Sequence, residues 1–194
     1  MDFDVYKPPK AALHDSRVNS AAGNKYYVVS NKKFLLLYIS TLGIYSVYWF
    51  YKNWSLYKKS TGESMLPVMR GIFSIFFAHS LFRKVDSSIQ EKSIPYSWSP
   101  KMLATVYVIS ALVANFSDRL ATKGIGSPIT DFLGLILAFS AGWALYRAQG
   151  AINMACNDPH GAANADITPA NIIWIILGVV LWALILIGIF ATLE

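Results

Sequence analysis

Few residues in this sequence have the types and spacing that chemistry requires. Cys156 and His160 lie four positions apart, with Asp158 between them and Asp166 beyond. Thiolate and imidazole are ligands for zinc and similar metals. A proline and a glycine flank His160 and break helical spacing, and the single cysteine leaves no second Cys–His pair. We therefore predict no metal site and no cofactor, and interpret this stretch as a polar loop.

Nucleophilic catalysis needs a nucleophile, a base and a group that orients the base. The three histidines, His14, His79 and His160, lie in different regions, and the chain has no Gly-x-Ser-x-Gly motif. We predict no catalytic residues, and a membrane enzyme is the least favoured alternative.

Charged and aromatic residues within apolar stretches are the stronger candidates for function. Ionisable side chains in a membrane segment are functional candidates by default, and arginine and lysine can extend to lipid phosphates. Tryptophan prefers the headgroup level of a bilayer. On these grounds we predict lipid or ligand contact for Arg70, His79, Lys52, Trp49, Trp54 and Arg147.

A polar stripe suggests a different function. Tyr38, Thr41, Tyr45 and Tyr48 recur at i, i+3, i+7 and i+10, so they would share one face of a continuous helix. Their hydroxyls could line a permeation path. A small transporter or channel subunit is therefore the main alternative hypothesis.

The elements that carry these residues are predicted to be membrane helices. The chain is 55% hydrophobic and 14% charged, whereas an ordinary soluble domain is about 25% charged. Serine or threonine followed by proline marks three helix starts, at Ser99, Ser127 and Thr168. We predict three transmembrane helices after them, over 102–116, 129–146 and 171–192.

Two aromatic segments precede these helices. Residues 34–54 are apolar and crowded with tyrosine and tryptophan, and Gly43 lies where a helix would break. Residues 65–82 are interrupted by Arg70 and His79. We predict that they form a re-entrant or interfacial helix pair within an all-α integral membrane protein; five full spans are the alternative.

Loop charges favour the re-entrant arrangement. If residues 34–54 dip into the bilayer and return, the lysines and arginines up to Lys101 lie on one side, together with Arg147. Only Arg119 and Lys123 then lie on the other side. The positive-inside rule places the amino terminus in the cytoplasm and the carboxyl terminus in the periplasm.

Small residues at every fourth position mark one face of the second predicted span. Gly134, Ala138 and Gly142 would let another helix approach closely. Packing within the chain is the favoured interpretation, and homo-oligomerisation stays open.

Residues 1–24 are predicted to form a disordered cytoplasmic arm, and residues 25–194 a single helical membrane domain. The arm contains Tyr6-Lys7-Pro8-Pro9-Lys10, which favours polyproline II and could bind a partner protein. The net charge of +6 comes from lysines and arginines at the edges of apolar segments. Anionic lipid headgroups explain them better than nucleic acid does.

The stretch from Thr41 to Tyr51, TLGIYSVYWFY, resembles the T-L-G-I-Y-x-x-Y-W core of a bacterial membrane-domain family of unknown function, and the resemblance extends through residues 69–73. It implies a bacterial inner-membrane protein but no activity. Together these features predict a non-enzymatic inner-membrane module that binds lipid headgroups or a partner protein.

Overall fold

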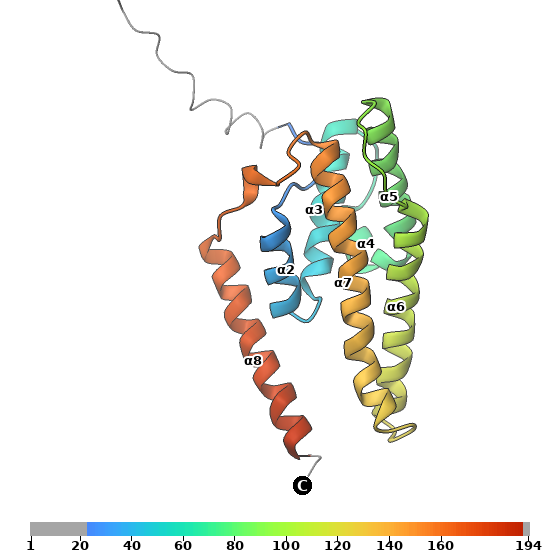
Figure 1. Cartoon of the computed structure of the whole chain (residues 1–194), viewed down its shortest axis with the longest axis vertical. Helices are drawn as coiled ribbons and strands as arrows, with labels where there is room; N and C mark the ends of the chain where they lie inside the picture. The colour runs from blue at the N-terminus through green and yellow to red at the C-terminus, as the bar shows by residue number, and fades with distance from the viewer. Residues whose placement is uncertain (1–22, 192–194) are drawn as a thin grey trace, which may run out of the picture.

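The structure, a computed structural model, describes residues 23–191; the side chains of residues 131 and 189–191 are not described. This part of the chain is helical and contains no β-strand, so the all-α prediction is confirmed there. The predicted arm lies outside the described residues except for its last two positions. The helices are α2 (Asn31–Ser40), α3 (Tyr45–Thr61), α4 (Pro67–Ile72), α5 (Ser74–Glu91), α6 (Pro100–Ala121), α7 (Ile129–Ala155), the 3₁₀ turn η1 (Ala162–Asn164) and α8 (Pro169–Ala191) (Figure 1).

Helices α2 and α3 form a hairpin. The predicted break is present: Leu42 and Gly43 have φ angles of 52° and 85°, which lie in the left-handed region that favours glycine. Thr41 stabilises the turn, since its Oγ1 donates to the carbonyl of Leu37 and accepts from the amide of Tyr45. Figure 1 shows the hairpin turning part of the way along α7, so it is shorter than α6, α7 and α8.

The predicted single segment at residues 65–82 is instead two helices. The break lies at Phe73, with φ −95° and ψ 39°, and separates α4 from α5. Helix α5 also continues to Glu91, beyond the apolar run. It does so because its buried residues recur at helical spacing after the hydropathy falls: Ala78, Leu81, Phe82, Val85 and Ile89.

Helices α6 and α7 form an antiparallel pair, and α7 is the central helix, with contacts to α2, α5 and α6 (Figure 1). The three helix starts lie close to where the sequence predicted them, and the predicted hydroxyl cap is present at α8. There Thr168 Oγ1 accepts from the amide of Asn171 at 3.4 Å, whereas Ser99 makes no capping bond to α6.

Within the described residues, two helices are long and apolar enough to cross a membrane, α6 and the Pro169–Gly188 part of α8. The prediction of three such helices is therefore not supported. Helix α7 is not among them; its second half carries Arg147, Gln149 and Asn153, and the last two are buried in the core.

The buried polar side chains of α7 hold an extended segment, residues 26–30, against the bundle. Asn153 Nδ2 donates to the carbonyl of Val29 at 2.9 Å, and its Oδ1 accepts from the Val29 amide at 3.4 Å. Gln149 Nε2 donates to the carbonyl of Tyr27 at 3.1 Å, and its Oε1 accepts from the indole of Trp49. These amides replace the strand partner that the segment lacks.

Candidate functional site

A pocket of about 280 Å³ opens between α5 and α6. It brings together three side chains that can carry positive charge and one carboxylate, and we call it the basic pocket. Arg83 and Lys101 are exposed, so both can reach a ligand. Its lining residues are His79, Arg83, Asp86, Pro100 and Lys101.

A hydrogen-bond chain fixes the imidazole of His79 at the pocket wall. Thr105 Oγ1 donates its only proton to the carbonyl of Lys101 at 2.9 Å. The 3.1 Å contact between Thr105 Oγ1 and His79 Nε2 must then have His79 as donor. This hydrogen bond fixes the orientation of the imidazole ring at the pocket wall.

Asp86 is held by neutral donors. Its Oδ1 accepts from Trp98 Nε1 at 2.8 Å, and its Oδ2 accepts from Gln90 Nε2 at 2.7 Å. Neither donor carries a positive charge, so these bonds give the carboxylate no counter-ion, although it lines the same pocket as His79, Arg83 and Lys101.

An exposed apolar stripe begins at the pocket and follows α6 away from it. Its large side chains are Ile109, Leu112 and Phe116, which are 54%, 53% and 62% exposed. They share one helix face with Lys101 because they follow it by 8, 11 and 15 positions. Phe76 of α5, one turn before His79, is 77% exposed. The cationic side chains of the basic pocket thus lie at one end of an exposed apolar surface.

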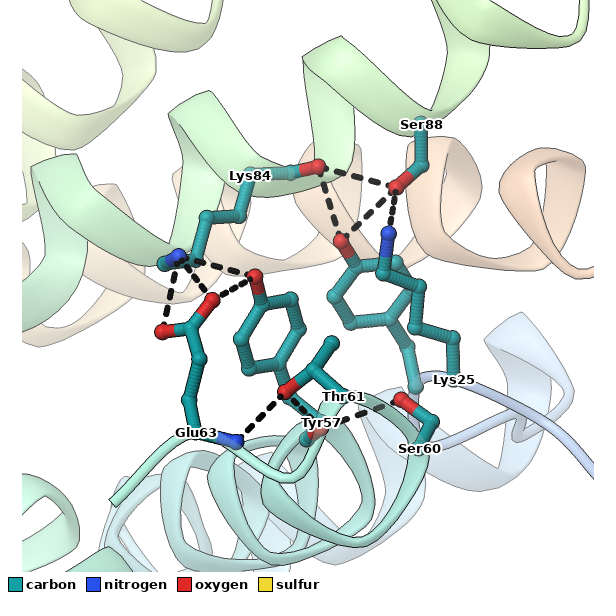
Figure 2. Close-up of polar contacts among 8 residues, drawn as sticks. Lys25, Tyr57, Ser60, Thr61, Glu63, Lys84 and Ser88 are labelled. Atoms are coloured by element: carbon teal, nitrogen blue, oxygen red, sulfur yellow. Dashed lines mark hydrogen bonds and ion pairs between the residues drawn. The ribbon is translucent and has the colours of Figure 1, made fainter. Parts of the chain in front are cut away.

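A second polar cluster joins α3, α5 and the extended segment (Figure 2). Lys84 Nζ lies 3.1 Å from Glu63 Oε1 in a salt bridge and donates to the hydroxyl of Tyr57 at 2.8 Å. That hydroxyl donates to Glu63 at 2.6 Å. Lys84 Nζ also lies 4.4 Å from the centre of the Tyr57 ring, a cation–π contact.

This cluster changes the acidity of its members. The hydrogen bond from Tyr57 lowers the pKa of the Glu63 carboxyl, and Lys84 lowers it further. Burial alone would lower the pKa of Lys84, but its hydrogen bonds to Tyr57 and Glu63 outweigh burial and raise it. Both charged forms are therefore favoured in the folded protein.

Ser88 and Lys25 have the geometry of a serine–lysine dyad, with Lys25 Nζ 3.0 Å from Ser88 Oγ (Figure 2). The hydroxyl also bonds to Tyr26 and to the carbonyl of Lys84, and Ser88 is 3% exposed. Because Lys25 donates to a buried hydroxyl, we interpret the pair as a clamp on the extended segment.

The six residues predicted to contact lipid or a ligand lie in different environments. Trp49 and Trp54 are fully buried, so the prediction that they contact lipid is wrong. Aromatic side chains favour both cores and interfaces, and here the core contacts prevail. Arg70 stacks on Trp54, with its guanidinium carbon 4.3 Å from the ring centre, and lies 5.0 Å from the ring of Phe77. Lys52 lies 6.0 Å from the ring of Tyr48.

His79 and Arg147 are both exposed, but they lie on different helices, and only His79 lines the basic pocket. The structure therefore does not combine the six predicted residues into one site.

The polar stripe is not continuous, because the turn at residues 41–44 separates Tyr38 from Tyr45. Tyr38 is buried and donates to the carbonyl of Ala138 at 2.8 Å. The Thr41 hydroxyl is used in hydrogen bonds within the turn, to the Leu37 carbonyl and the Tyr45 amide. Tyr45 and Tyr48 line a pocket of about 110 Å³ between the hairpin and α8.

The small residues of α7 make room for side chains of the same chain. A Cβ on Gly142 would lie 2.4 Å from the ring of Tyr38, and a Cβ on Gly134 would lie 2.6 Å from Asp118 Oδ1. Together with the Tyr38–Ala138 bond, these contacts place the stripe of small residues against α2 and α6.

The loop after α7 contains Cys156, Asp158 and His160, for which the sequence predicts a polar loop and no metal site. Asp158 accepts from the amides of Ala162 and Ala163, both at 2.9 Å, and the Cys156 sulfur lies 3.9 Å from the carbonyl of Tyr26. Among the side chains that the structure describes, no group of three or more possible metal ligands gathers.

Arg83, Asp86 and Lys101 were not predicted as site residues from the sequence. A signal was present, because Phe76, His79, Arg83 and Asp86 follow the spacing i, i+3, i+7 and i+10 and share one face of α5. It was missed because the predicted segment ended at Phe82.

Comparisons with protein-family models, with curated proteins and with solved structures found no match for this chain. The resemblance to the membrane-domain family therefore stays a prediction.

Proposed function

We propose that this chain is a non-enzymatic membrane protein whose basic pocket binds the phosphate group of a lipid. One observation carries the proposal: the cationic groups of the pocket lie at the head of the exposed apolar stripe. A phospholipid has the same order of parts, with a charged phosphate above apolar chains. Arginine and lysine bind phosphate through charge-assisted hydrogen bonds.

The membrane placement begins with α6 and α8, which have the length and composition of spans. Helix α7 runs antiparallel to α6 and returns to the end where α8 begins, so it must cross as well (Figure 1). Its polar half faces α2 and the extended segment, which makes the crossing compatible with lipid around the rest of the helix.

In this arrangement the α2–α3 hairpin is re-entrant. Broken backbone inside a bilayer needs protein cover, because lipid offers no hydrogen bonds. Helix α8 supplies such cover: Trp182 Nε1 donates to the carbonyl of Ile39 at 2.9 Å, and Gly178 lies directly against the backbone of Ser40. These contacts support the hairpin hypothesis over five full spans.

The orientation follows from charge. The end of the bundle where α3 and α5 finish and α6 begins carries Lys58, Lys59, Lys92 and Lys101, and we call it the basic end. Arg119 and Lys123 lie at the opposite end, where α6 meets α7. The positive-inside rule supports a cytoplasmic basic end and a periplasmic carboxyl terminus in a bacterial inner membrane.

The test is binding of short-chain phosphatidic acid to the full chain purified in a nonionic maltoside, measured by calorimetry, with short-chain diacylglycerol as the phosphate-free ligand. The double substitution Arg83→Gln/Lys101→Gln is expected to weaken phosphatidic acid binding at least tenfold, since each charged hydrogen bond contributes about 1.5–3 kcal/mol.

The matched control is Lys32→Gln/Lys59→Gln, which removes the same charge from two exposed residues outside the pocket. It should leave binding within about twofold of the wild-type value. Equal losses in the two variants would mean that net charge, and not the pocket, attracts the lipid. Equal binding of diacylglycerol would remove the phosphate from the proposal.

A further inference from the structure

A second, wider groove of about 610 Å³ lies beside the α5–α6 loop. Asp86 and Pro100 line both this groove and the basic pocket, so the two form one composite site with Asp86 on the shared wall. The groove adds the side chains of Gln90, Tyr96 and Trp98.

The two parts of this site have opposite electrostatic character. Arg83 and Lys101 line only the basic pocket, whereas Asp86 is the one charged residue that lines the groove. The two hydrogen bonds to the Asp86 carboxylate come from uncharged donors, and each of its oxygens has lone pairs beyond those used by Trp98 and Gln90. A second anionic group would be repelled here and a cation attracted.

The groove also offers aromatic surface. Tyr96 and Trp98 are both part-exposed and line it beside Asp86. An ammonium group gains from an aromatic face as well as from a carboxylate. The groove therefore fits a cationic group better than the hydroxyls of a glycerol or inositol headgroup, which would leave the negative charge uncompensated.

We infer that the composite site recognises a zwitterionic phosphoethanolamine group, with its phosphate in the basic pocket and its ammonium against Asp86. This inference rests on the proposed function, because it assigns the phosphate to the same side chains. Two adjoining pockets with a shared wall suit two charges joined by a two-carbon linker. The exposed apolar stripe commits the ligand to a lipid, because a free phosphoethanolamine would leave it unused.

The ligand side gives a test that requires no variant. Binding of short-chain phosphatidylethanolamine and of its N-acetyl derivative is measured on the full chain in maltoside. Acetylation removes the ammonium charge and keeps the phosphate and linker. We expect the N-acetyl lipid to bind about tenfold more weakly, as loss of a desolvated cation–π and carboxylate contact implies. Equal affinities would overturn the inference.

The protein side uses Asp86→Asn, which keeps an oxygen for Trp98 and removes the charge. It should abolish the difference between the two lipids and strengthen phosphatidic acid binding, because it removes a carboxylate beside the phosphate. An unchanged difference in this variant would contradict the role of Asp86. Thermal unfolding of the variant checks that it is folded, and the lipid pair tests the inference even if it is not.

Further measurements distinguish failure of this inference from failure of the proposed function. If phosphatidic acid and phosphatidylethanolamine bind equally and Arg83→Gln/Lys101→Gln weakens both, the inference fails while the proposed function stands. If neither binds, both fail. Soluble phosphoethanolamine is expected to compete only at concentrations far above those of the lipid. Tight binding of the soluble compound without binding of the lipid would make a free phosphate ester the ligand and overturn the lipid assignment.

Discussion

The indole Nε1 of Trp182 in α8 donates a 2.9 Å hydrogen bond to the main-chain carbonyl of Ile39 in the last turn of α2. The same carbonyl accepts from the amide of Leu42, so it keeps one partner when the indole is lost. We predict that Trp182→Phe destabilises the protein by about 1 kcal/mol, the net value of one hydrogen bond. Unfolding by a denaturing detergent measures the change. The control is Trp174→Phe, because the Trp174 side chain is 47% exposed and its indole makes no hydrogen bond to the described residues; it should change stability by less than half as much.

Two glycines of α8 provide a matched pair. A Cβ on Gly178 would lie 1.9 Å from the carbonyl oxygen of Ser40, whereas a Cβ on Gly188 would meet nothing within 4 Å. Gly178→Ala should therefore cost about 1–3 kcal/mol, since backbone must move. Gly188→Ala should be neutral or stabilise by up to about 1 kcal/mol through helix propensity. Equal effects on the unfolding free energy would show that α8 does not pack against α2.

The Asn153 side chain holds the extended segment against α7 through two hydrogen bonds to Val29. Removing that side chain should therefore free the segment. Asn153→Ala leaves the amide and carbonyl of Val29 without their side-chain partner, at a cost of about 1–3 kcal/mol for each buried group. Hydrogen exchange at residues 27–30 should accelerate before the rest of the protein unfolds. Asn115→Ala is the control, because Asn115 is exposed and bonds only to its own helix, at Ala111. Unchanged exchange at Val29 in the Asn153 variant would contradict this role.

The pKa of Glu63 is lowered in the folded state, by the hydroxyl of Tyr57 first and by Lys84 second. Its contribution to stability is therefore complete above the ordinary glutamate pKa and is lost as the pH falls through the lowered value. The difference in melting temperature between wild type and Glu63→Gln should be small, because the pair is solvent-exposed, and should vanish in acid.

The matched variant for this pH profile is Glu91→Gln, which removes a carboxylate from the exposed end of α5. It should not reproduce the acid-dependent difference. A difference for Glu63→Gln that grows as the pH falls would have the wrong sign for this salt bridge.

Cysteine labelling tests the topology. In a Cys156→Ser background, we expect a membrane-impermeant maleimide to label Lys123→Cys in intact cells and Lys59→Cys only after permeabilisation. Cys156 itself should react slowly because burial raises the pKa of its thiol. Labelling of Lys59→Cys in intact cells would favour five spans over the re-entrant hairpin.

Local signals predicted much of the helical framework. The prolines before the last three helices and the glycine at position 43 act within a few residues, so their effects could be read from the sequence. The extent of α5 was missed because a hydropathy boundary at Phe82 does not end a helix whose buried positions continue at the same spacing.

The candidate site could not be predicted in the same way. Trp49 and Trp54 are equally suited to a core and to an interface, and contacts with distant helices decide between them. The basic pocket depends on α5 and α6 packing side by side, and Lys101 lies 22 positions beyond His79. The helical spacing on α5 indicated the residues that α5 contributes to the pocket. The residues that α6 contributes could be recognised only from the packing of α6 against α5.

The contacts of α8 determine the order in which this protein can be completed during its synthesis. Among the described helices, α8 makes its close backbone contacts with α2, and its first turns also line a pocket with Tyr45 and Tyr48 of α3. It is also the last of the described helices to leave the ribosome, well after the hairpin it covers. In the proposed re-entrant arrangement, the end of α2 must remain hydrated or find a temporary partner such as an insertase or chaperone until α8 has been made. The hairpin is made first, but α8 can cover it only after α8 itself has been synthesised.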